Sequence, residues 1–153
     1  MSDRTSESDR IVIGVDPHKA SWTAAAVGPG LRPLATIRVP VDPQDYRDLR
    51  CFAARWPAAV WAIEGAGGLG APLATRLSAD GIAAVDVPAK LAARVRVLST
   101  GHGRKNDDAD ATSVAVAAHS AAGLPPSPLT RRSPRCAPWS NTATTWSRPA
   151  PRR

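Results

Sequence analysis

Apolar positions between residues 10 and 123 fall into short runs whose period changes along the chain. Residues 11–15 are continuously apolar and rich in β-branched side chains, which is typical of a buried strand. Residues 21–27 and 34–39 have a similar character, and short turn segments separate the three runs. We therefore expect a three-strand meander at the start of the fold.

Helical spacing replaces this pattern from residue 43 onward. Asp42 is a suitable N-cap for a helix at 43–56, and one face of that helix would carry Tyr46, Leu49, Phe52 and Ala53. The further elements expected are strands at 59–63 and 82–87 and helices at 69–79, 89–98 and 107–122. A meander followed by alternating helices and strands predicts an α/β fold, with a mixed sheet covered by helices.

The 153 residues allow one domain with a substantial core. Composition changes near Gly123, after which Pro, Arg, Ser and Thr dominate and no period survives. We expect a disordered N-terminus at 1–9, a domain at 10–123 and a disordered basic tail at 124–153. A frameshift is the other interpretation of the tail. GC-rich codons for it, read two nucleotides later, encode AAVAADAAFAALRALVEHRDDLVETRT, which is an amphipathic helix.

The net charge of +7 is concentrated in that tail, which holds six arginines and no acid. Subtracting the tail leaves 14 basic and 13 acidic side chains in residues 1–123, so charge alone does not establish DNA binding. No apolar run approaches the roughly 20 residues of a membrane span. Residues 1–10 also lack the apolar core of a secretory signal. We expect a cytoplasmic protein with no membrane partner.

Carboxylates stand at the ends of several predicted elements. Asp16 follows the first apolar strand, Glu64 follows the strand at 59–63, and Asp107 and Asp110 lie in the first turn of the last helix. A turn before Pro17 explains Asp16 alone, and helix capping explains one or two of the later acids. Neither explanation covers all four positions, and residues three apart on a helix share a face.

Four acids brought to one place would repel one another and require a cation. Carboxylate oxygens are hard ligands that favour Mg²⁺ or Mn²⁺. Two such ions about 4 Å apart can clamp the attacking and leaving oxygens in phosphodiester chemistry. We therefore expect Asp16, Glu64, Asp107 and Asp110 to be both metal ligands and catalytic residues.

Three motifs in this order, GVDPHK, AIEGAG and GRKNDDADA, resemble the DEDD transposases of the IS110 insertion-sequence group. The resemblance covers residues 10–123 and implies a ribonuclease-H-like domain similar to the RuvC Holliday-junction resolvase. It implies DNA cleavage and recombination by the four acids, with Asp108 as a bystander. It also implies DNA as partner, a structured guide RNA in some relatives, and a homo-oligomer in full-length relatives. The family's C-terminal serine-bearing domain is missing here, so we expect the chain to be inactive alone.

Basic residues near the acids are candidates for DNA-backbone contacts. These are Lys19, Arg104 and Lys105, although a solvated loop explains the last two equally well. For His18 we favour a surface turn over a role in the site. The tryptophans Trp22, Trp56 and Trp61 are expected to pack in the core or at its rim rather than stack on bases.

A dinucleotide-binding module is the alternative. Gly65-x-Gly67-x-x-Gly70 follows a predicted strand and opens a predicted helix, and Asp86 ends the next strand. Glu64 argues against this module, because a carboxylate directly before the first glycine would repel a pyrophosphate. The three strands that precede the motif are also unusual for that fold.

Overall fold

A computed structural model describes residues 10–100 and 106–128 of the chain. Its centre is a five-stranded mixed sheet with strand order β3-β2-β1-β4-β5. The strands are β1 (Val12–Pro17), β2 (Ser21–Val27), β3 (Pro33–Pro40), β4 (Val60–Glu64) and β5 (Ala84–Val87). The helices are α1 (Pro43–Ala53), α2 (Ala71–Ala79), α3 (Ala89–Thr100) and α4 (Asp107–Ser120). The predicted meander and the mixed α/β sheet are both confirmed.

Strand direction changes at β1, the central strand. β1 pairs antiparallel with β2, and β2 pairs antiparallel with β3, because short turns connect them. On its other side β1 pairs parallel with β4, and β4 pairs parallel with β5, each after a helical crossover. The carboxyl ends of β1, β4 and β5 therefore lie at the same edge of the sheet.

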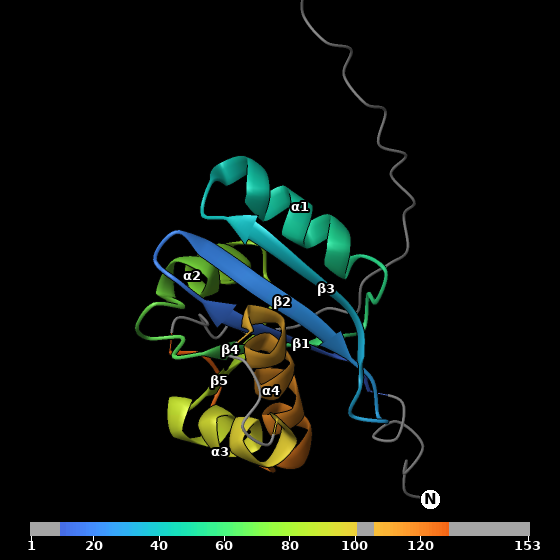
Figure 1. Ribbon diagram of the computed structural model, residues 1–153. Coiled ribbons are helices and arrows are strands. Elements are labelled where there is room, and N and C mark those ends of the chain that lie inside the picture. Colours follow the sequence, from blue (N-terminus) through green and yellow to red (C-terminus); the bar gives the residue numbers. More distant parts are fainter. Residues whose placement is uncertain (1–9, 101–105, 129–153) are drawn as a thin grey trace, which may run out of the picture.

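Two apolar layers cover the two faces of this sheet. Alternate side chains of β1 point to opposite faces: Ile13 and Val15 pack in the layer that includes α1 and α2, and Val12 packs in the layer that includes α3 and α4. Figure 1 shows α4 lying across the sheet with α3 beside it. The tryptophans pack as predicted, with Trp22 and Trp61 buried and Trp56 partly buried against the core.

Element ends differ from the prediction by a few residues. Asp42 caps α1, since its Oδ1 accepts a hydrogen bond from the Gln44 N–H at 2.9 Å. This helix ends at Ala53 rather than residue 56. The helix expected from residue 69 begins at Ala71, because residues 65–70 form turns closed by hydrogen bonds to the Gly65 carbonyl. None of the described helices is long and apolar enough to cross a membrane.

Ordered contacts continue past Gly123, the boundary that composition predicted. The Asp86 N–H donates to the Pro125 carbonyl at 3.0 Å, and the Ser127 N–H donates to the Ala84 carbonyl at 2.7 Å. The physical reason is that β5 is an edge strand, whose free backbone groups bind an adjacent extended segment. The parts expected to be disordered at 1–9 and 129–153 lie outside the described residues.

Helix α4 approaches β1 more closely than a side chain would permit. A Cβ added to Gly14 would lie 2.5 Å from the Ala111 carbonyl oxygen and would also clash with the Ala115 backbone nitrogen. Both obstacles belong to the helix backbone, which cannot move aside as a flexible side chain would. Gly14 therefore sets the distance between the central strand and the helix that carries Asp107 and Asp110.

We predict that Gly14→Ala destabilises the protein by about 2 kcal/mol, the usual size of an overpacking penalty. Thermal unfolding followed by circular dichroism would measure the loss. Gly30→Ala is the matched control, since an added Cβ there meets nothing within 4 Å. Equal melting temperatures for the two variants would contradict the close approach of α4.

Candidate active site

The register of the central strands brings two of the predicted acids together. Val15 pairs with Ile63 in the parallel β1–β4 ladder. The next residues, Asp16 and Glu64, therefore reach the carboxyl edge of the sheet side by side. Both side chains lie on the face of the sheet that α4 covers, as do Val12 and Ala62 of the same strands. The carboxyl edge is also where open α/β sheets bind their ligands.

The first turn of α4 delivers the other acids to the same edge. Asn106 caps this helix, and its Oδ1 accepts a hydrogen bond from the Asp108 N–H at 3.2 Å. Asp110 is only 3% exposed, whereas Asp107 is partly buried and Asp108 is exposed. Asp108 therefore differs from the other two acids in being exposed to solvent.

Basic side chains from β1–β3 contact the acids at the outer part of this edge. His18 Nε2 lies 3.0 Å from Asp16 Oδ2 and 3.7 Å from Asp107 Oδ1. Arg38 Nη1 donates to Asp107 Oδ2 at 2.6 Å. The surface-turn interpretation that we favoured for His18 was wrong in one respect: its backbone forms the turn, but its ring reaches back to the acids.

Arg38 reaches the site because three strands are in lateral register. Asp16 pairs with Thr23, and Thr23 pairs with Arg38, so the three side chains form one row on the α4 face. Thr23 is fully buried, and its hydroxyl has no hydrogen-bond partner among the described residues. No motif in the sequence identified Thr23 or Arg38, because their position depends on the pairing register.

Helix α3 supplies a third basic group, which lies among the most buried acids. Arg96 Nε is 2.6 Å from Asp110 Oδ1, and its Nη2 is 3.6 Å from Glu64 Oε2. The sequence predicted the helix but gave no signal for this residue, since Arg94 and Arg96 look alike in a helical pattern.

Burial and mutual repulsion raise the pKa values of two carboxyl groups. Desolvation is the largest cause of the raised pKa of Asp16, and the nearby Asp110 adds to it, whereas His18 and Arg96 oppose it. Desolvation also raises the pKa of Glu64, with Asp16 as the next contribution. The charges of Asp16 and Asp110 therefore act on neighbouring carboxyl groups of the same cluster.

The carboxylate oxygens of this cluster are ligands of the kind that divalent cations prefer, but they do not lie close enough together to coordinate one ion. Oε2 of Glu64 and Oδ1 of Asp110 are buried, and neither accepts a well-aligned hydrogen bond from the described residues. Within 10–100 and 106–128, no three His, Cys, Asp or Glu side chains are grouped closely enough to hold one ion. The Arg96 guanidinium contacts both of those oxygens instead.

Of the three basic residues predicted to contact DNA, Lys19 lies in the described part of the chain. Lys19 is exposed and lines a small surface hollow together with His18 and Leu69. Arg104 and Lys105 lie outside the described residues.

The dinucleotide alternative is not supported, because backbone N–H groups of the glycine-rich segment already donate hydrogen bonds within the protein. The N–H of Gly65 donates to the Val87 carbonyl, and those of Gly68 and Gly70 donate to the Gly65 carbonyl. Asp86, the acid of the next strand in this motif, accepts a hydrogen bond from the Ala66 N–H at 2.8 Å. A cradle for pyrophosphate needs such groups to point outward.

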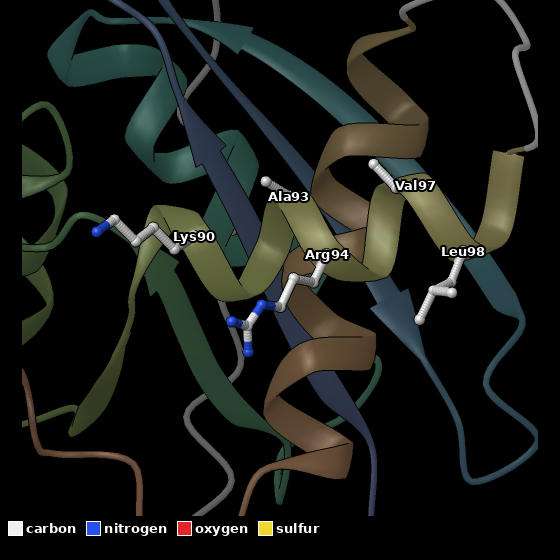
Figure 2. A pocket seen from close by; sticks show the side chains of 5 residues that line it. All are labelled: Lys90, Ala93, Arg94, Val97 and Leu98. Atoms are coloured by element: carbon white, nitrogen blue, oxygen red, sulfur yellow. The ribbon is translucent and has the colours of Figure 1, made fainter.

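A separate hollow lies on the outer side of α3 (Figure 2). Its lining residues are Lys90, Ala93, Arg94, Val97 and Leu98. It contains no carboxylate or hydroxyl group, so it does not supply the chemistry expected of the acid cluster.

Comparisons with known proteins show the family and the fold of this chain. The model of the IS110 DEDD family, described as transposase, matches residues 13–133. Among solved structures, RuvC of T. thermophilus in complex with a Holliday junction substrate matches with a TM-score of 0.54 and 16% sequence identity. The match covers 71% of this chain and 91% of that one, and it confirms the ribonuclease-H-like fold. A search of curated proteins finds no match.

We predict that Glu64→Gln raises the melting temperature of the metal-free protein at neutral pH, because it removes a partly buried carboxylate whose pKa is raised by desolvation. The raised pKa means that the folded wild type gains stability as pH falls, and that this gain is lost as pH rises through the folded-state pKa. The advantage of the variant should therefore shrink on acidification from about pH 8 to about pH 4. Thermal melts in the presence of a chelator would measure it.

Asp108→Asn is the control for this comparison, since Asp108 is an exposed acid. It should leave the melting temperature nearly unchanged across the same pH range. A Glu64→Gln protein that melts below wild type at neutral pH would contradict the dominance of desolvation.

Proposed function

The chain belongs to the IS110 family of DEDD transposases, and on that premise we propose that its acid cluster is the divalent-metal site for cleaving and rejoining DNA strands. The observation that carries the proposal is the convergence of Asp16, Glu64 and Asp110. They come from two strands and a helix that are distant in sequence. The charge of Asp110 raises the pKa of Asp16, and the charges of Asp16 and Asp110 both raise the pKa of Glu64.

Mg²⁺ or Mn²⁺ is the cofactor that this donor set favours, since its ligands would all be carboxylate oxygens. Asp16, Glu64, Asp107 and Asp110 would hold the ions. When bound, a pair of divalent ions polarises a scissile phosphate and stabilises charge on the attacking and leaving oxygens. The protein's own part is to hold the four acids at one edge of a rigid sheet, which limits their reorganisation during the reaction.

DNA is the proposed partner, and the rim of the site offers positive charge for its backbone. Lys19 lies directly after His18 in the exposed β1–β2 turn. Arg104 and Lys105 precede the α4 acids in sequence and are proposed for the same role. A structured guide RNA and a homo-oligomer, which the resemblance implied, also belong to the proposal. So does the cytoplasmic location that we expected from the apolar pattern of the sequence.

Metal binding can be tested separately from strand exchange. We predict that Mg²⁺ or Mn²⁺ raises the melting temperature of the wild-type chain, by a stabilisation of about 2.7 kcal/mol at 100 times the dissociation constant. Asp16→Asn and Asp110→Asn should abolish the rise, because each removes a ligand. Differential scanning fluorimetry across a metal titration would measure it.

Asp108→Asn is again the matched control and should keep the full rise. An undiminished rise in the Asp16 and Asp110 variants would exclude these residues from the metal site. A wild-type protein that fails to bind either metal would overturn the proposed function.

We predict that Lys19→Ala weakens binding to duplex and branched DNA to a similar degree, since a phosphate contact carries no sequence information. The slope of log affinity against log salt should decrease by about 1. Fluorescence anisotropy at several salt concentrations measures both quantities. The control is Arg47→Ala, an exposed basic residue on α1, across the sheet. An unchanged slope for Lys19→Ala would remove this residue from the DNA interface.

A further inference from the structure

Arg96 is the basic group that reaches the most buried part of the acid cluster. It bridges two elements, since its guanidinium contacts Glu64 at the end of β4 and Asp110 in the first turn of α4. It also acts electrostatically on Asp16 of β1. One positively charged side chain thus interacts with three of the four carboxylates proposed as metal ligands.

The packing of α3 explains why the guanidinium remains there. Ala92, one turn before Arg96, is fully buried in the layer that includes α4, and Val95 packs against the same layer. These contacts hold the helix close to α4, and they leave the Arg96 side chain only 30% exposed at the acids.

The quality of the contact differs from that of a structural Arg–carboxylate pair. Such pairs are commonly bidentate, with two aligned N–H···O bonds. Here Asp110 Oδ1 is close to Arg96 but accepts no well-aligned hydrogen bond, and Glu64 Oε2 is 3.6 Å away. The guanidinium therefore neutralises these oxygens without satisfying their preferred geometry, and a small cation with oxygen preference would satisfy it better.

We infer that Arg96 is the resident cation of the acid cluster and that divalent metal binding displaces it. This inference rests on the proposed metal site and adds a competition to it. In the metal-free protein Arg96 offsets the repulsion between Asp16, Glu64 and Asp110. Because the guanidinium and the metal contact the same oxygens, each weakens the binding of the other by the same factor.

The experiment uses the full chain with Arg96→Gln, which removes the charge but keeps a long polar side chain. Two quantities are measured: the melting temperature in chelator, and the dissociation constant of Mn²⁺ by isothermal titration calorimetry. We expect the variant to melt below wild type without metal, because the acids lose their cation. We expect it to bind Mn²⁺ about tenfold more tightly, the change expected from one displaced charged contact.

Two further variants make the test specific. Arg94→Gln causes the same charge change on the same helix, and Arg94 lines the outer hollow of α3 (Figure 2). It should leave both quantities near their wild-type values. Arg96→Lys keeps a cation and should restore most of the metal-free stability, with Mn²⁺ affinity closer to wild type than that of Arg96→Gln.

The outcomes separate the two ideas. Wild type that binds Mn²⁺, with an Arg96→Gln variant that binds equally or more weakly, would overturn the competition and leave the metal site intact. Loss of stability with and without metal, and no gain in affinity, would show that Arg96 only holds α3 in place. No Mn²⁺ binding by wild type or by Arg96→Gln would overturn the metal site, and the competition with it.

Discussion

The close packing of α4 against the central strand is the constraint on which the site depends. At Gly14 the backbone of α4 occupies the space that any side chain would fill. The helix can approach so far because its facing positions, Ala111 and Ala115, are also small and fully buried. That approach places the first turn of α4, with Asp110, beside Asp16 on the strand. A larger residue at position 14 would push α4 away from β1 and would therefore increase the distance between Asp110 and Asp16.

Placing several carboxylates in one half-buried cluster creates an electrostatic cost that the fold must offset. The raised pKa values of Asp16 and Glu64 express this cost, since burial disfavours their charged forms. Three side chains contact the acids: His18 from a turn, Arg38 from an outer strand and Arg96 from a helix. Arg38 and Arg96 therefore give the acid cluster of this transposase domain permanent positive charge, and the two arginines differ in burial.

The difference in burial changes how strongly each arginine interacts with the acids. Arg38 has a side chain 61% exposed, and solvent screens its contact with Asp107. Arg96 reaches Asp110, whose side chain is 4% exposed, so its charge acts in a less polar environment. If the acids bind metal as proposed, Arg96 is the group whose contacts the ion must replace. The affinity of the site would then depend on a residue outside the DEDD motif.

The sequence by itself determined the succession of strands and helices along the chain, and the positions of the acids at the ends of these elements, because periodicity and capping are local properties. That succession also predicted the mixed sheet. The motifs also identified the family. Only the tertiary structure decided that Thr23 and Arg38 share a row with Asp16, since that follows from strand register. It also decided that Arg96, rather than Arg94, reaches the acids, because the rotation of α3 is set by its packing against α4. Charge partners depend on distances between separate elements, which no local pattern contains.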